Sequence, residues 1–155
     1  MAGSIEQRLA ELGIELPAPA AAAANYVPVR RSGDLLVVSG QLPIEAGAVR
    51  YKGKLGGVVS LEDGQAAARL CAVNILAQVK AACGGDLERI AACLRLGGFV
   101  ACTPEFTDHP KVINGASDLL VEVLGEAGHH ARAAVGVSSL PFDAAVEVDG
   151  MFELR

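Results

Sequence analysis

Hydrophobic and polar residues alternate along this chain with two different periods, which separate helical from extended segments. In residues 4–12, 60–82 and 108–124, apolar side chains recur every three or four positions, the spacing of one face of an α-helix. Near the C-terminus, Val146 and Val148 alternate with acidic residues, the period of a strand with one buried face. The chain is therefore expected to combine helices with strands.

Each helical segment begins at a residue that favours a helix start. Ser4 and Gln7 have the spacing of a capping box, and Ser60 and Asp63 show the same type of spacing before the second segment. Asp108 stands at the start of the third segment, shortly before a proline. Glycines follow all three segments. The pattern predicts one short N-terminal helix and two long helices that face a core.

Between the first helix and the first strand lies a connector. Pro17 and Pro19 disfavour helix, whereas the run from Ala20 to Ala24 taken alone would favour it. We expect an extended connector.

Several segments before the tail read as strands. Residues 26–31 and 35–38 are separated by a Ser-Gly-Asp turn, which predicts a hairpin whose second strand is buried on both faces. A short strand is expected near Val49. Residues 94–103 form another predicted strand, in which Gly97-Gly98 suggests a bulge or bend.

The tail reads as a second hairpin. Residues 131–138 and 144–154 are apolar-rich strands on either side of a turn around Pro141 and Phe142. The predicted order is helix, two or three strands, helix, strand, helix, two strands, with no repeat and no long linker. This order indicates an α+β fold in which helices form a layer against one sheet, in a single domain spanning residues 1–155.

Composition excludes several classes of function. The formal net charge is −5 and aromatic residues make up only 4% of the chain, which argues against nucleic acid as a partner. No apolar run approaches the roughly 20 residues of a membrane span, so no membrane association is expected. The N-terminus lacks the charged-then-apolar pattern of a signal peptide. A cytoplasmic location follows as the expectation.

The cysteines and histidines do not suggest a metal site. The four cysteines are Cys71, Cys83, Cys93 and Cys102, which contain no C-x-x-C pair and stand among small apolar residues, so we expect four reduced core thiols. His129 and His130 are adjacent, and in an extended strand they point to opposite faces. We predict no metal.

Arg132 is the first candidate for chemistry. By strand parity it shares a face with Ala134, Gly136 and Ser138, whose small side chains leave room for a planar anion. The guanidinium donors match a carboxylate bidentately, which a lysine cannot reproduce. The alternative is an arginine that extends to water or pairs with an acid on a neighbouring strand.

Glu147 is the second candidate. In a tail hairpin centred near Pro141, Glu147 lies opposite Gly136 and on the same face as Arg132. The two are then separated by about 13 Å along the strand, so direct pairing needs a bend, a register shift or a second copy of the chain. The alternative is an acid on a solvated sheet face.

Several segments of the sequence together resemble a known protein family. The segment A-R-A-A-V-G-V-S-S-L-P at 131–141, followed by V-E-V at 146–148, is similar to the C-terminal signature of the RidA/YjgF family, also called the L-PSP endoribonuclease family. Tyr26 and S-G-Q-L-P at 39–43 match its N-terminal hairpin, and Asn114 falls where the family has an Asn on its second main helix. The resemblance covers about 26–153, so residues 26–155 are taken as the family core and 1–25 as an added helix and connector.

The resemblance implies a chorismate-mutase-like fold, with one mixed sheet, two main helices on one face and a short N-terminal helix. It also implies a homotrimer with sites between subunits. The implied activity is hydrolysis of small reactive 2-imino or enamine acids to 2-oxo acids and ammonia, without a cofactor. By matching position, Arg132 would hold the substrate carboxylate and Glu147 would position or activate water. The implied cleft-lining residues are Tyr26, Ser39, Gly40, Asn114 and Ala134.

The sequence also departs from the family pattern. Ala134 replaces a frequent Cys, His129-His130 replaces an aromatic residue or Pro, and the region 46–57 is longer than in the short archetype. We interpret the chain as a member of a divergent subgroup, for which the family pattern does not identify the substrate. A protein that binds a small carboxylate without turning it over is the alternative hypothesis, and an endoribonuclease ranks third, because the chain is acidic and has no convincing pair of catalytic histidines.

Overall fold

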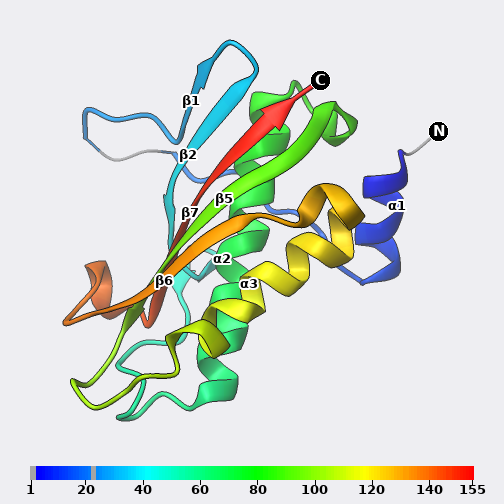
Figure 1. Ribbon diagram of the computed structural model, residues 1–155. Coiled ribbons are helices and arrows are strands. Elements are labelled where there is room, and N and C mark those ends of the chain that lie inside the picture. The colour runs from blue at the N-terminus through cyan, green and yellow to red at the C-terminus, as the bar shows by residue number, and fades with distance from the viewer. Residues whose placement is uncertain (1–2, 22–23) are drawn as a thin grey trace.

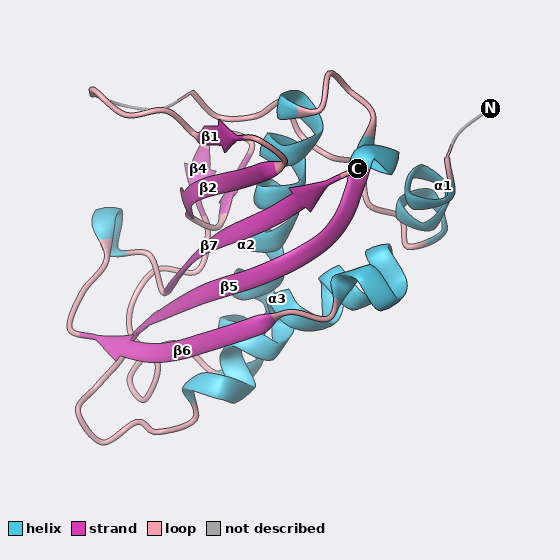
Figure 2. Cartoon of the chain, turned by 45° about the horizontal axis from the view of Figure 1, so that its top comes forward, coloured by secondary structure: helices cyan, strands magenta, loops and turns pink. Residues whose placement is uncertain are grey.

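The computed structural model describes residues 3–21 and 24–155. One five-stranded mixed sheet forms the centre, in the order β1-β2-β7-β5-β6 (Figures 1 and 2). Its strands are β1 (Val29–Ser32), β2 (Leu35–Gln41), β5 (Ile90–Ala101), β6 (Ala131–Val137) and β7 (Val146–Leu154). The helices are α1 (Ser4–Glu11), α2 (Leu61–Ala82) and α3 (His109–Leu124). A separate pair, β3 (Ile44–Glu45) and β4 (Ala48–Val49), and three short 3₁₀ helices at Leu87–Arg89, Gly125–Gly128 and Pro141–Asp143 complete the described elements.

The expected α+β architecture is confirmed. The long helices α2 and α3 both pack against the same face of the sheet, and α1 packs at the edge of this layer against α3 (Figure 1). The core between sheet and helices consists of small and aliphatic side chains around one buried aromatic residue, Phe152. Within the described residues, no helix combines the length and apolar character needed to cross a bilayer.

The helix starts agree with the sequence pattern at two positions and differ at one. The Ser60 hydroxyl accepts a hydrogen bond from the Asp63 amide at 3.1 Å, as its spacing predicted. Asp108 occupies the N-cap of α3, but its side chain makes no capping bond. The predicted capping box at Ser4 was wrong, because Ser4 lies inside α1 and Gly3 is the N-cap.

A distant carboxylate caps α1 in place of Ser4. Glu88 Oε1 accepts a hydrogen bond from the Ile5 amide at 2.7 Å. A Cβ on Gly3 would collide with this Glu88 side chain, so glycine leaves room for the carboxylate to reach the helix end. The cap therefore depends on a residue 83 positions away, which local sequence does not reveal.

The connector and first strand are shifted relative to prediction. The described connector residues are not helical, as expected, while Ala22 and Ala23 lie outside the described residues. The first strand begins at Val29, so Tyr26 precedes it. In β2, exposure alternates: Leu36 and Val38 are buried, whereas Leu35 is 39% and Val37 is 46% exposed. The prediction that this strand is buried on both faces was wrong for the single chain, because none of the described elements covers Leu35 and Val37 on the outer face of the sheet.

The predicted tail hairpin was also wrong. β6 and β7 are neighbours in sequence, but β5 lies between them, pairing parallel with β6 and antiparallel with β7. The parallel pair is joined through α3, as a parallel connection requires a crossover. β6 is therefore an edge strand (Figure 2).

Gly97 and Gly98 serve close packing rather than a bulge. Both pair regularly with β7, and the register shifts of β5 occur earlier, between Ile90 and Ala92 and between Cys93 and Arg95. A Cβ on Gly98 would lie 2.5 Å from Ile113 Cγ1. The glycine thus lets α3 approach the sheet, and this approach sets the position of the groove between α3 and β6.

Candidate functional site

Arg132 lies at the edge of the sheet beside α3. It pairs with Leu96 of β5, whose side chain is buried on the helix-covered face, so Arg132 points toward that face. Its Nη1 donates hydrogen bonds to Asn114 Oδ1 at 2.8 Å and to Ser117 Oγ at 3.1 Å. Asn114 and Ser117 are three positions apart on α3, which places both on one side of that helix.

Both partners of Arg132 are neutral. The two hydrogen bonds use both protons of Nη1. Within the described part of the chain, Nε and Nη2 make no hydrogen bond and no acid pairs with this guanidinium. The Nε–Nη2 edge, which can bind a carboxylate through two parallel hydrogen bonds, is therefore available.

A cavity of about 600 Å³ opens beside the guanidinium. Its lining contains Arg132 and its two helix partners, together with both consecutive histidines and three further residues of α3: Asn114, Ser117, Asp118, Val121, Glu122, His129, His130 and Arg132. Glu122 is engaged by Arg69, with 3.2 Å between Oε2 and Nη2. The space is sufficient for a small organic acid.

His130 extends the network behind Arg132. Its Nε2 lies 2.9 Å from Ser117 Oγ, and its Nδ1 lies 2.6 Å from the Gly128 carbonyl oxygen. Because a carbonyl only accepts, Nδ1 carries a proton, and in the neutral ring Nε2 accepts from the Ser117 hydroxyl. Ser117 Oγ then accepts a hydrogen bond from Arg132 Nη1. Each group from Gly128 to Arg132 therefore has a donor facing an acceptor.

Sequence reasoning did not identify Ser117 or His130. The signals were the three-residue spacing from Asn114 to Ser117 on a predicted helix and the two-residue spacing from His130 to Arg132, which puts both on one side of extended chain. Neither spacing is specific without knowing that this helix and this strand are adjacent.

Glu147 lies on the opposite, outer face of the sheet. It pairs with Phe99, which pairs with Val135, and Val135 is 46% exposed on that face. The Glu147 carboxylate packs over Gly40, where any Cβ would collide with it. Partial burial, and secondarily the nearby Asp149 carboxylate, raise the pKa of Glu147.

The prediction that Glu147 shares a face with Arg132 was therefore wrong. Two strand spacings and three residues along β6 separate the two backbones by about 14 Å, and the side chains point to opposite faces. The error follows from the tail pairing, because inserting β5 between β6 and β7 changes which residues lie opposite one another.

The structure divides the predicted site residues into two groups. Arg132, Asn114 and Ala134 belong to the groove between β6 and α3, where Ala134 packs against the core. Ser39 and Gly40 line a second cavity of about 180 Å³, together with Tyr26 and Phe142.

Glu147 joins this second group through its contact with Gly40. We call Arg132, Asn114 and Ala134 the arginine half-site, and Tyr26, Ser39, Gly40 and Glu147 the glutamate half-site. Within one chain the two do not meet.

The four cysteines are free, but they are not equivalent. Cys71, Cys83 and Cys93 are buried as predicted, whereas Cys102 is only partly buried. Burial raises the pKa of Cys71 well above its ordinary value and that of Cys93 to about 12. Among the residues described, no group of three or more His, Cys, Asp or Glu side chains has the arrangement of a metal site.

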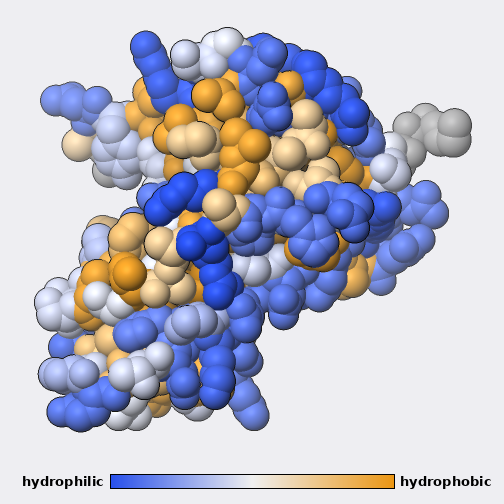
Figure 3. Space-filling view, in the orientation of Figure 1, coloured by the Kyte–Doolittle hydropathy of each residue, from blue (hydrophilic) through white to orange (hydrophobic). Residues whose placement is uncertain are grey.

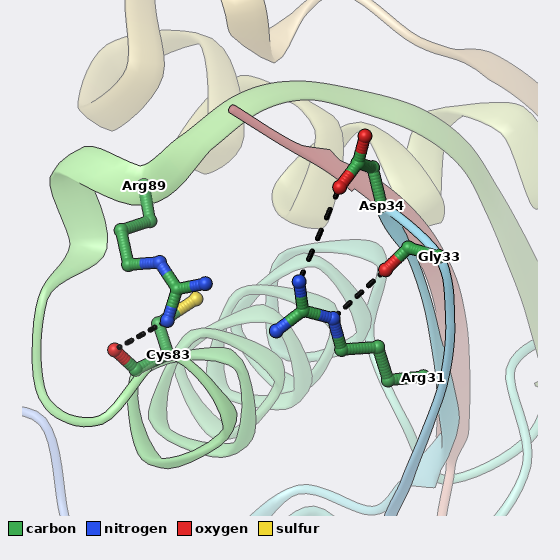
Figure 4. Close-up of polar contacts among 5 residues, drawn as sticks. All are labelled: Arg31, Gly33, Asp34, Cys83 and Arg89. Atoms are coloured by element: carbon green, nitrogen blue, oxygen red, sulfur yellow. Dashed lines mark hydrogen bonds and ion pairs between the residues drawn. The ribbon is translucent and has the colours of Figure 1, made fainter.

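Cys83 lies at the C-terminal end of α2. Burial is the largest influence on its thiol and raises its pKa, although the nearby Arg89 acts in the opposite direction. Arg89 Nη1 donates to the Cys83 carbonyl oxygen at 3.4 Å, while Arg31 Nε donates to the Gly33 carbonyl oxygen at 2.8 Å (Figure 4). Arg89 therefore satisfies a carbonyl at the end of α2, and Arg31 satisfies a carbonyl in the turn between β1 and β2.

Comparison with known proteins places these features in a family. The family described as "YjgF/chorismate_mutase-like, putative endoribonuclease" matches residues 6–154. Protein TCP17 of Trypanosoma cruzi is 49% identical over 154 residues, covering 99% of this chain and 96% of that protein.

Solved structures agree over nearly the whole chain. A protein of unknown function from Agrobacterium tumefaciens is 56% identical with a TM-score of 0.93, covering 98% of this chain and 93% of that one. A "putative endoribonuclease" from Shewanella oneidensis is 41% identical with a TM-score of 0.94, covering 98% of this chain and 100% of that one.

Proposed function

Since this chain belongs to the RidA/YjgF family, whose fold supports the binding or processing of small molecules, we propose that it hydrolyses small 2-imino or enamine acids to 2-oxo acids and ammonia. Arg132 would hold the substrate carboxylate. The observation that carries the proposal is the Arg132 guanidinium, which lines a cavity of about 600 Å³ and, among the described residues, bonds only to neutral groups and leaves its Nε–Nη2 edge without a hydrogen bond.

The reaction needs no electron transfer. A protonated imine carbon is already electrophilic, so water adds to it to form a carbinolamine, and loss of ammonia then forms the 2-oxo acid. Glu147 would accept a proton from the attacking water and return a proton to the leaving nitrogen. Its raised pKa suits this role, because a group that both takes and gives a proton works best when its pKa lies near the working pH.

The arrangement requires two copies of the chain, and we propose a homotrimer with sites between subunits. Arg132 and Glu147 point to opposite faces of one sheet, so a shared site needs the glutamate half-site of a neighbouring subunit. The outer face offers a surface for that contact: Leu35, Val37 and Val135 are large apolar side chains exposed on it. In the space-filling view, hydrophobic residues are exposed in separate patches on this side of the molecule, with hydrophilic residues between them (Figure 3).

The direct test generates 2-iminobutanoate with a pyridoxal-phosphate enzyme and follows its decay with and without this protein. We expect acceleration by wild type and loss of activity in Arg132→Ala. Arg132→Lys is the matched control, because lysine keeps the charge but cannot form the bidentate pair, and it should recover only a small part of the activity. Wild type that gives no acceleration, where an active family member does, would end the deaminase proposal.

A second candidate is a protein that binds a small carboxylate without turning it over. It is favoured by the separation of the two half-sites within one chain, because binding needs only Arg132 and its groove. Saturable binding of a 2-oxo acid that raises the unfolding temperature, lost in Arg132→Ala and unaccompanied by imine turnover, would select this function.

A further inference from the structure

A third cavity lies at the other end of the groove between α3 and β6. Its volume is about 500 Å³, and its lining combines a thiol, an imidazole, an ammonium group, three hydroxyls and apolar surface: Lys54, Cys102, Thr103, Pro104, Phe106, Thr107, His109, Gly136, Val137 and Ser138. Neither the arginine half-site nor the glutamate half-site includes any of these residues.

Three segments bring this cavity together. Cys102 follows the end of β5 and donates its amide to the Val137 carbonyl oxygen of β6 at 3.1 Å. It also forms an isolated bridge with Leu55, which brings the neighbouring Lys54 to the rim. His109 is the first residue of α3. In Figure 1 the loop from β5 to α3 runs beside the end of β6.

Cys102 and His109 form a close pair. The Cys102 Sγ lies 3.4 Å from His109 Nε2. The imidazole packs edge-on against the Phe106 ring, with centroids 5.4 Å apart and an interplanar angle of 88°. This contact restrains the ring, which therefore directs Nε2 toward the sulfur.

Gly136 provides the space for the pair. A Cβ at this position would lie 2.5 Å from His109 Nε2 and 2.7 Å from Cys102 Sγ. The pair thus lies directly over the backbone of β6, and any larger residue at 136 would displace one of its members. Since Cys102 also lines the cavity, a small molecule inside can reach the sulfur.

We propose that Cys102 and His109 form a nucleophilic thiol site for small α,β-unsaturated carboxylic acids. His109 Nε2 accepts the thiol proton as the sulfur attacks the β-carbon. The new S–C bond replaces the π bond of the alkene, and the resulting carbanion takes the proton back at its α-carbon. The product is a thioether, and no oxidant or reductant takes part.

Lys54 supplies the preference for a carboxylate. Lys54 lines the cavity, and in residues 3–21 and 24–155 its ammonium group forms no ion pair. Phe106, Pro104 and Val137 offer the apolar surface that a short carbon chain would contact. The three remaining cysteines cannot compete for such a ligand, because they are buried.

The test compares two maleimides, which are conjugate acceptors of nearly the same size. Full-length wild type is treated with anionic 3-maleimidopropionate or neutral N-ethylmaleimide, and the modified residue and rate are followed by peptide mass spectrometry. We expect one modified thiol, Cys102, and faster reaction with the anionic reagent. Lys54→Gln should abolish that preference, so the ratio of the anionic rate to the neutral rate should fall to the ratio measured for a free thiol such as N-acetylcysteine.

Two variants test the role of the imidazole. His109→Phe keeps a ring beside Phe106 but removes the proton acceptor, so modification of Cys102 should slow by at least about tenfold. Gly136→Ala keeps both residues but displaces them, so modification of Cys102 should also slow in this variant. Modification of Cys102 at the wild-type rate in both variants, or no preference for the anionic reagent in wild type, would overturn the proposal.

Discussion

At the scale of single residues, the central feature is how Arg132 is held. An acid at Asn114 or Ser117 would neutralise the guanidinium and compete with any ligand, whereas the neutral amide and hydroxyl fix its position and preserve its charge. The bonds converge on Nη1 and leave the opposite edge for a carboxylate. The same two contacts therefore fix the position of the guanidinium and leave its Nε–Nη2 edge available to a ligand.

Ser117→Ala tests this placement. It removes one partner of Arg132 and the hydroxyl that His130 contacts, so the guanidinium should lose part of its orientation. We expect affinity for 2-oxobutanoate to fall by about 1 kcal/mol, or roughly fivefold, measured by calorimetry. Ser139→Ala, at an exposed position, is the matched control and should bind like wild type. Equal affinity in both variants would show that Ser117 does not position Arg132.

Glu147→Gln tests whether ionisation of the Glu147 carboxyl, whose pKa is raised, destabilises the folded protein. A raised pKa means that the folded state binds the proton more tightly than the unfolded chain, so stability falls as pH rises through the window that begins near the ordinary value of 4.5. Glutamine removes this penalty. The variant should therefore unfold at a higher temperature than wild type at pH 8, and the gain should vanish at pH 4. Thermal scans across pH check the sign, and a gain that grows toward low pH would contradict it.

Residue-level sequence patterns predicted part of this site. Strand parity correctly put Arg132 and Ala134 on one side of β6, because that pattern depends only on neighbouring residues. The partnership with Ser117 and His130 depends on how closely α3 approaches β6, which tertiary packing decides. Glu147 was assigned to the wrong face because its position depends on which strand lies next to β7.

At the scale of elements, glycines also set how closely the two long helices approach each other. Gly115 of α3 faces the backbone of α2 so closely that a Cβ would collide with the Gln65 carbonyl oxygen. Gly64 of α2 meets only side chains, with its Cβ position 2.8 Å from Leu55 Cδ1. One glycine is therefore required by backbone contact and the other by side-chain packing.

Gly115→Ala tests this distinction. Alanine should favour an isolated helix by about 1 kcal/mol, yet the collision with a backbone carbonyl must move α3 and should destabilise the fold by roughly 1–3 kcal/mol net. Gly64→Ala is the control, because a side chain can move aside, and its cost should be smaller. Chemical denaturation measures both. Gly115→Ala that is as stable as wild type would contradict the close contact.

Element order was easier to predict than strand pairing. Helical periodicity and glycine stops located α2 and α3 closely, since both signals are local. The sequence pattern predicted a hairpin in the tail because a short turn joins its two strands. In the structure β5 lies between them and pairs with β6 along one side and with β7 along the other. Alternation within one strand cannot reveal which other strand lies beside it.

At the scale of the whole molecule, the proposed homotrimer would bring the arginine half-site of one subunit to the glutamate half-site of another. Arg132 lies on the helix-covered side of an edge strand, and Glu147 lies on the open face near the centre of the sheet. If each proposed site combines these groups from different chains, a chain defective in one group can still contribute the other.

Subunit mixing tests this arrangement. Arg132→Ala and Glu147→Gln are each expected to be inactive toward 2-iminobutanoate. When equal amounts are unfolded together and refolded, about a quarter of the sites in randomly assorted oligomers should combine an intact Arg132 with an intact Glu147 from another chain. Activity should return to that fraction of refolded wild type, measured by imine decay, while either variant refolded alone stays inactive. No recovery in the mixture, with wild type recovering normally, would contradict the shared site.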